Sequence, residues 1–166
     1  IRDRPIITHQ NPLPIAIHKC KEKEKVWMLY KIVKRIHFCY VNRLLEYDGK
    51  CANPHGHNGI LEIELLSNKL DSRGMVYDFT DVKKQLSEFI ELEIDHRMLL
   101  REDDPIVAAL EALGETVFTM RDNPTAENIA KLIFQEAKER NLPVASVRLW
   151  ETPNAFAEYR EKPVDE

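Results

Sequence analysis

Two runs of alternating apolar and polar residues constrain the fold of this chain more than any other feature. The first run places Met28, Tyr30, Ile32, Ile36, Phe38 and Tyr40 on alternate positions, interrupted only by Lys34. In the second run, Leu61, Ile63 and Leu65 alternate with Glu62 and Glu64. Alternation with a period of two is typical of a strand with one buried face. The two runs therefore predict an antiparallel hairpin whose long loop includes residues 46–50.

Helical spacing begins after this hairpin. Asp78 or Thr80 can cap a helix whose apolar residues recur at helical intervals: Val82, Leu86, Phe89, Ile90 and Ile94. The sequence pattern of residues 104–113 predicts a short helix that ends at Gly114. Asn123 and Pro124 are typical of an N-cap followed by the first residue of another helix. Its apolar stripe would be Ala126, Ile129, Ala130, Ile133, Phe134 and Ala137.

The end of the chain returns to strand patterns and completes the predicted architecture. Val147 and Leu149 alternate toward Glu151, and residues 155–159 can form a short closing strand. This order predicts an α+β fold in which helices cover one face of an antiparallel sheet. Residues 1–25 contain three prolines and a run of mixed charge without any period, so we expect an N-terminal extension there. Residues 26–166 are then expected to form a single domain.

Composition excludes several classes of partner. The net charge of −4 is mild, and no block of Lys or Arg is long enough to predict binding to nucleic acid. No apolar run approaches the length that a membrane-spanning helix needs. The three cysteines are odd in number and spread through the chain, which is not typical of a disulfide framework: they are Cys20, Cys39 and Cys51. A reducing compartment fits them best, and we expect a cytoplasmic protein.

The densest group of chemically versatile residues is Cys51, His55 and His57. Histidines two positions apart in an extended segment point to the same side, and these two share their parity with Leu61 and Ile63. Both imidazoles should therefore face the covered side of the sheet, where a converging pair can begin a zinc site. The alternative is a pair of histidines that bond to neighbours in a polar loop.

Acidic residues mark three further candidate positions. Asp95 can orient the imidazole of His96, and such an imidazole can activate a thiol such as that of Cys51. The alternative for this pair is a histidine favoured by the dipole at a helix end. Glu151 lies at the end of a strand, on the face that carries the apolar residues of that strand. A carboxylate on a buried face has to be paired or bound to a ligand. Glu127 lies in the first turn of a predicted helix, where dipole complementarity is the alternative.

Taken together, these motifs resemble one known family. The segments FCYVNR (38–43), CANPHGHN (51–58), GMVYDF (74–79), DH (95–96), PTAEN (124–128) and WET (150–152) occur in the order found in the 6-pyruvoyl- and 6-carboxy-tetrahydropterin synthases. The resemblance covers residues 28–160. It is greater to the bacterial 6-carboxy branch, because Cys51 stands four residues before His55, where the animal 6-pyruvoyl enzymes have a longer insert.

The resemblance implies the T-fold, an antiparallel four-stranded sheet with two helices on one face. Three such subunits form a barrel, and two barrels stack as a hexamer, so the chain is expected to be a homo-oligomer. The implied activity is that of a zinc-dependent carbon–oxygen lyase acting on 7,8-dihydroneopterin triphosphate. The 6-carboxy branch also releases acetaldehyde, and its product feeds queuosine synthesis.

The resemblance also implies roles for particular residues. His55 and His57 would bind zinc, while Cys51, Asp95 and His96 would form a proton-transfer triad shared between subunits. Glu151 would hold the amino and ring N–H groups of the pterin. Thr125 and Glu127 would assist Glu151 in binding the substrate. These three substrate-binding roles are implied by the resemblance alone.

The chain departs from the family pattern at Asn42, where the family has a zinc-binding histidine just before an arginine. Asn42 has the parity of Phe38 and Tyr40, but an amide oxygen is a poorer zinc ligand than imidazole. His37 lies on the opposite face. Three outcomes are open: zinc held weakly by His55, His57 and either water or Asn42; recruitment of Cys51 as third ligand; or no zinc. We predict weakened but detectable zinc binding.

Two alternatives to a 6-carboxy-tetrahydropterin synthase are open, and Asn42 motivates the second of them. One is a 6-pyruvoyl-tetrahydropterin synthase, and another is a pterin-binding paralogue that has lost the ancestral activity. A purely structural oligomer would leave the coincidence of Cys51, His55, His57 and Glu151 unexplained.

Overall fold

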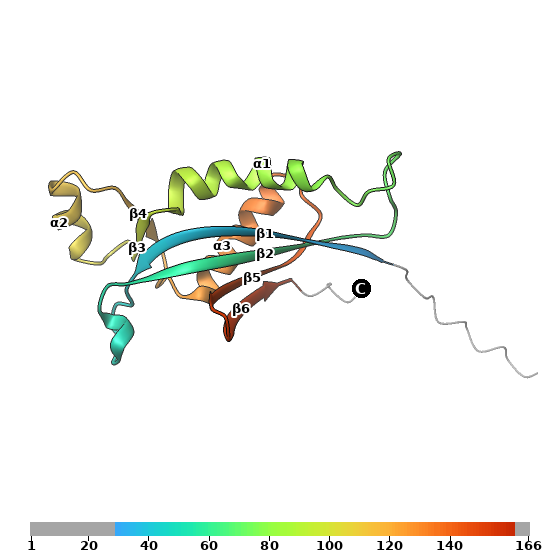
Figure 1. Cartoon of the computed structure of the whole chain (residues 1–166). Helices are drawn as coiled ribbons and strands as arrows, with labels where there is room; N and C mark the ends of the chain where they lie inside the picture. The colour runs from blue at the N-terminus through green and yellow to red at the C-terminus, as the bar shows by residue number, and fades with distance from the viewer. Residues whose placement is uncertain (1–28, 162–166) are drawn as a thin grey trace, which may run out of the picture.

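The structure of this protein is a computed structural model that describes residues 29–161 (Figure 1). The predicted N-terminal extension, residues 1–25, lies outside the described residues. The predicted domain of residues 26–166 is described except at its two ends.

The first hairpin has the predicted form. Strand β1 (Tyr30–Asn42) pairs antiparallel with β2 (His55–Ser67) along its whole length, from Tyr30 opposite Ser67 to Asn42 opposite His55. The loop between them contains one short 3₁₀ turn, η1 (Lys50–Ala52). Strand β5 (Val144–Thr152) then pairs antiparallel with β2, and β6 (Ala155–Arg160) pairs antiparallel with β5.

The prediction of an antiparallel four-stranded sheet is wrong, because the sheet has six strands of mixed direction within the described residues. Strand β3 (Arg97–Arg101) lies parallel to β1, and β4 (Val117–Met120) lies parallel to β3. The resulting order is β4-β3-β1-β2-β5-β6. Strands this short contain too few residues for a clear alternation, and their pairing is set by a helical crossover that no local pattern reveals.

Two helices cover one face of this sheet (Figure 1). Helix α1 (Phe79–Phe89) begins at Asp78, whose side chain accepts from the Thr80 amide, and continues into the π turn η2 (Ile90–Ile94). Helix α3 (Ala126–Glu139) begins at Thr125 rather than at the predicted Asn123 cap. A further helix, α2 (Ile106–Ala112), lies near one end of the sheet and has no buried residue.

The core lies between the sheet and these two helices. It includes most of the predicted apolar residues of the first hairpin and of both long helices, among them Ile36, Phe38, Leu61, Ile63, Leu65, Val82, Leu86, Ile129, Ile133, Phe134, Val147 and Leu149. Of the predicted alternating residues, Met28 lies outside the described residues and Tyr30 is exposed. The even residues of β1 and the odd residues of β2 thus face the helices. No helix in the described part of the chain is both long and apolar enough to cross a membrane.

Candidate functional site

Asn42 and His55 face each other where β1 ends and β2 begins. They are directly paired in the antiparallel register, on the face that the helices cover. The His55 Nδ1 atom lies 2.9 Å from the carbonyl oxygen of Asn53. A carbonyl only accepts, so Nδ1 carries the proton and Nε2 keeps the lone pair that a metal needs.

The side chain of Asn42 is held in one orientation. Its Nδ2 atom donates to the carbonyl oxygen of Pro124 at 2.8 Å, and only 2% of the residue is exposed. Its Oδ1 atom is buried without a hydrogen-bond partner. Because a buried oxygen without a partner is costly, this atom is poised to bind a ligand that supplies positive charge.

His57 lies beside His55 and reaches Glu151. The two imidazole rings pack edge to face with their centroids 4.9 Å apart. The Nε2 atom of His57 is buried without a hydrogen-bond partner and lies 3.7 Å from Oε1 of Glu151. The structure thus brings the end of β5 to the paired ends of β1 and β2.

Tyr40 connects the same carboxylate to the core. Its hydroxyl donates to Oε1 of Glu151 at 2.9 Å, and its ring lies 5.2 Å from that of His57. Burial, together with the neighbouring charge of Glu151 and this hydrogen bond, raises the pKa of Tyr40 well above its usual value. Tyr40 therefore remains a neutral donor that fixes the position of one Glu151 oxygen.

These donors fit a zinc ion. His55 and His57 each offer an imidazole nitrogen, and the unpaired amide oxygen of Asn42 is the third candidate donor. All three donors are neutral, and one of them is a weak ligand. The arrangement is therefore compatible with zinc binding that is weaker than in a site of three imidazoles.

A cleft opens beside these residues. It has a volume of about 650 Å³, and its walls include His57, Trp150, Glu151 and Thr152. This volume is within the range of small-molecule sites. A carboxylate at the wall can accept two adjacent N–H donors from a planar ring, the pattern that a pterin presents.

Cys51 lies in η1, close to the end of β1. Its carbonyl oxygen accepts from the amide of Leu44, two residues beyond Asn42. Its thiol is half-buried and free. The backbone thus brings Cys51 to the same end of the hairpin as His55 and Asn42.

Asp95 and His96 lie beside a different cysteine within the chain. The carboxylate of Asp95 is 3.0 Å from Nδ1 of His96, as the sequence predicts for an oriented imidazole. Their nearest described thiol is that of Cys39: ligand atoms of Cys39, Asp95 and His96 all lie within 4.8 Å of one another. Cys51 is not part of this cluster.

Thr125 and Glu127 occupy the beginning of α3. The Thr125 hydroxyl accepts from the amide of Asn128 and so caps the helix. Glu127 is exposed in the first turn, where its charge complements the helix dipole. The loop before α3 does approach the site, because Pro124 accepts the hydrogen bond from Asn42.

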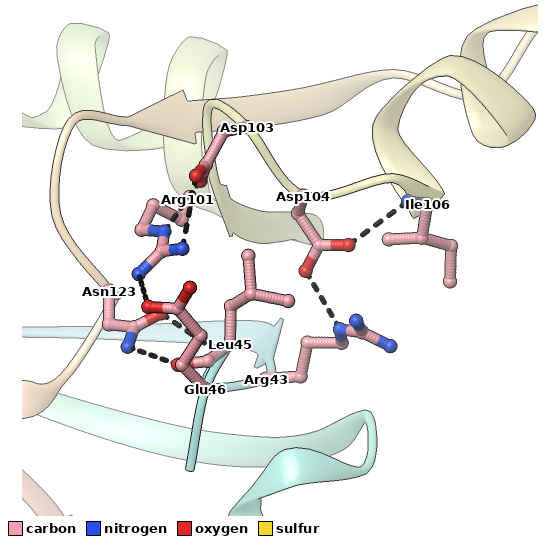
Figure 2. Close-up of polar contacts among 8 residues, drawn as sticks. All are labelled: Arg43, Leu45, Glu46, Arg101, Asp103, Asp104, Ile106 and Asn123. Carbon is pink, nitrogen blue, oxygen red and sulfur yellow. Dashed lines mark hydrogen bonds and ion pairs between the residues drawn. The ribbon is translucent and has the colours of Figure 1, made fainter.

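Polar contacts fix this loop to the end of β1 (Figure 2). The Asn123 side chain accepts from the amide of Leu45 and donates to its carbonyl, both at 2.8 Å. Arg43 donates to Asp104 at 2.8 Å, and the Asp104 side chain is fully buried. The segment immediately after Asn42 is therefore attached to two other loops, which stabilises the orientation of Asn42.

Sequence patterns did not identify three of the residues that shape this site. Tyr40 has the parity of Asn42, which could have indicated its position. Asn123 was interpreted as a helix cap, although its side chain holds Leu45 instead. Cys39 gave no signal, because its proximity to Asp95 depends on the unpredicted strand β3.

Comparisons with known proteins identify the family of this chain. Residues 31–162 match the sequence model of the family described as 6-pyruvoyl tetrahydropterin synthase. The chain belongs to this family. A 6-carboxy-5,6,7,8-tetrahydropterin synthase of Rickettsia conorii is 36% identical over 137 residues, which cover 78% of this chain and 99% of the relative. A synthase of the same name from Haemophilus influenzae is 35% identical over 141 residues, covering 80% of this chain and 100% of the relative.

Several solved structures share the fold of this chain. An uncharacterized protein from Wolinella succinogenes superposes with a TM-score of 0.67 at 26% identity, covering 81% of this chain and 99% of its own. The 6-pyruvoyl tetrahydropterin synthase of Caenorhabditis elegans gives a TM-score of 0.59 at 24% identity, covering 81% and 97% of the two chains, and here the likeness shows the fold alone.

Proposed function

We propose that this chain converts 7,8-dihydroneopterin triphosphate and one water molecule to 6-carboxy-tetrahydropterin, acetaldehyde and triphosphate. Support comes from the Rickettsia conorii relative, which is named for that product and is matched over 99% of its length. The structural observation behind the proposal is the 3.7 Å distance between Nε2 of His57 and Oε1 of Glu151. Both side chains line one cleft, which supports the proposal that His57 binds the metal and Glu151 the pterin.

Zinc would be held by His55, His57 and the amide oxygen of Asn42. Bound there, zinc would polarise the side-chain oxygens of the substrate and acidify the neighbouring C–H bonds. The protein keeps these donors ready: the Asn53 carbonyl fixes the proton of His55 on Nδ1, and the Pro124 carbonyl fixes the amide of Asn42.

Glu151 would bind the amino and ring N–H groups of the pterin. Its Oε1 atom already accepts from the Tyr40 hydroxyl, so that hydrogen bond holds the carboxylate while lone pairs remain for the ligand. Thr125 and Glu127 would assist from the beginning of α3. Their part in substrate binding is a proposal that rests on the family resemblance.

Cys51, Asp95 and His96 would transfer protons. Asp95 orients the ring of His96 through a 3.0 Å contact, and His96 would exchange protons with Cys51. Within one chain the Asp95–His96 pair lies beside Cys39, so we propose that Cys51 meets an Asp95–His96 pair from another subunit. This requires a homo-oligomer, and a hexamer of two stacked trimers is the proposed form.

Incubation of the purified full-length protein and zinc with 7,8-dihydroneopterin triphosphate tests this function. We expect 6-carboxy-tetrahydropterin and acetaldehyde, both identified by mass spectrometry. The matched control is Glu151→Gln, which keeps the size of the side chain but replaces a carboxylate oxygen by an amide. A zinc-loaded wild-type protein that leaves the substrate unchanged would contradict the proposal, and 6-pyruvoyl-tetrahydropterin as the product would favour the other branch of the family.

Asn42 favours a second candidate, a pterin-binding paralogue without the ancestral activity. The neutral amide oxygen of Asn42 coordinates a metal less strongly than an imidazole nitrogen does. Asn42→His distinguishes the two candidates. A large gain in turnover indicates an active enzyme with a weakened zinc site, whereas unchanged pterin binding without any turnover in either form indicates a binding protein.

A further inference from the structure

We propose that Cys39, Asp95 and His96 form a second divalent-metal site that is selective for thiophilic ions such as Zn²⁺ and Cd²⁺. It is separate from the candidate site of His55, His57 and Asn42, which is called the two-histidine site below. One thiol, one carboxylate and one imidazole each place a ligand atom within 4.8 Å of the other two. Three protein ligands of these kinds, with a water as the fourth, are a usual zinc coordination set.

The backbone holds these three residues together without any metal. The amide of Cys39 donates to Oδ1 of Asp95 at 2.8 Å, and the amide of His96 donates to the carbonyl of Cys39 at 2.7 Å. Both partners of Cys39 are therefore bonded to its own peptide groups. The ligand atoms are close because of strand pairing and the turn before β3, so little ordering is needed on binding.

Two local features make this turn unusual. The amide of Asp95 donates to the carbonyl of Ile90 at 2.7 Å, which closes the π turn η2. His96 follows with φ at 57°, a left-handed conformation that is strained for a non-glycine residue. Such features cluster at functional sites. They direct the two side chains toward Cys39.

The cluster is accessible to an ion. Cys39 and His96 line a cavity of about 720 Å³, whose wall also includes Met98, Leu110 and Val117. The Cys39 thiol now donates to Oδ1 of Asn58 at 3.2 Å. On binding, the metal–sulfur bond forms as the S–H bond breaks, and the proton leaves to solvent without any change of oxidation state.

Charge distinguishes this site from the two-histidine site. A thiolate and a carboxylate together offset the two positive charges of the ion, whereas His55, His57 and Asn42 offer only neutral donors. A soft ion such as Cd²⁺ should therefore prefer the site that contains Cys39. An ion bound there would also occupy the Asp95–His96 pair, and excess zinc would then inhibit turnover. That consequence rests on the proposed function, whereas the binding itself does not.

Titration of the full-length protein with Cd²⁺ tests the site through the ultraviolet sulfur-to-cadmium charge-transfer absorbance. Performed in a Cys20→Ser background, it leaves the two described thiols, Cys39 and Cys51. We expect the absorbance to saturate at one equivalent per chain, to disappear in Cys39→Ser and to persist in Cys51→Ser. Persistence in Cys39→Ser, or loss in Cys51→Ser alone, would overturn the proposal.

A second variant keeps the test valid if Cys39→Ser does not fold. The side chain of His96 is 78% exposed, so His96→Gln should fold, which circular dichroism can verify. It should weaken Cd²⁺ binding by at least about tenfold, the smallest loss usual even for outer-shell partners of a metal. An unchanged affinity would remove His96 from the site and contradict the proposal. Activity measured with excess Zn²⁺ then tests the inhibition separately, since Cys39→Ser should escape it.

Discussion

Replacing Asn42 by histidine should change metal affinity and apoprotein stability in opposite directions. Asn42 is 2% exposed, and its Nδ2 atom donates to the Pro124 carbonyl at 2.8 Å. A histidine that turns its ring toward the metal leaves that carbonyl without its donor. Loss of a buried hydrogen-bond partner costs about 1–3 kcal/mol. The free energy of unfolding of the metal-free variant should fall by this amount.

Zinc should reverse part of this loss. The variant exchanges a neutral amide oxygen for an imidazole nitrogen, a stronger zinc ligand. We expect zinc affinity to rise by at least about tenfold, which corresponds to about 1.4 kcal/mol. At a saturating zinc concentration the same difference adds to the stability of the folded state, because the ion binds the folded chain in preference to the unfolded one.

Chelator competition measures the zinc affinity, and urea unfolding with and without zinc measures both stabilities. The control is Asn68→His, which adds a histidine at an exposed position outside the site and should leave the zinc affinity unchanged. Equal zinc affinities for wild type and Asn42→His would refute the reasoning, since they would mean that position 42 does not face the ion.

Three further predictions concern neighbouring residues. Cys51→Ser should lower turnover by about 10²–10⁴-fold, the usual contribution of a proton-transferring group, without changing the zinc content; full activity would exclude Cys51 from catalysis. Burial and Glu151 raise the pKa of Tyr40 above the usual value of about 10, so above that pH the unfolded chain loses a proton that the folded chain keeps. Stability should therefore fall by about 1.4 kcal/mol per pH unit above pH 10 through Tyr40, and Tyr40→Phe should remove this slope in unfolding measurements; identical slopes would contradict the assigned environment. Asp104→Asn breaks the ion pair with Arg43 and should lower the free energy of unfolding by about 3 kcal/mol. This is the low end of the range for a buried ion pair, because the Arg43 side chain is 23% exposed. A loss below about 1 kcal/mol in unfolding measurements would show that the pair contributes little to stability.

The sequence predicted those parts of the fold that depend on local periodicity. Alternation located β1, β2, β5 and β6, and helical spacing located α1 and α3. The strands β3 and β4 escaped because each is short and pairs in parallel with a strand distant in the sequence. The Asn123 cap was wrong for a similar reason: its amide is bonded to Leu45, a contact between distant loops that outweighs the local helix-cap preference.

The candidate site was predictable where the alternation of residues along a strand alone decides which face of the sheet a side chain lies on. Asn42, His55 and His57 face the helices as expected, and Glu151 lines one cleft together with His57. Parity could not show that the Pro124 carbonyl fixes the Asn42 amide, or that Tyr40 bonds to Glu151. The position of Asp95 and His96 beside Cys39 also depends on the π turn and on β3, neither of which has a signature in the sequence.

Anomalous diffraction at the zinc absorption edge, from crystals of the zinc-loaded protein, tests the central claim most directly. We predict one strong peak bounded by Nε2 of His55, Nε2 of His57 and Oδ1 of Asn42, at the cleft that Glu151 lines. A second peak at Cys39 and His96 is expected when zinc is in excess. Density that shows both imidazoles bonded only to protein atoms, with no peak beside them, would contradict a metal-dependent pterin synthase.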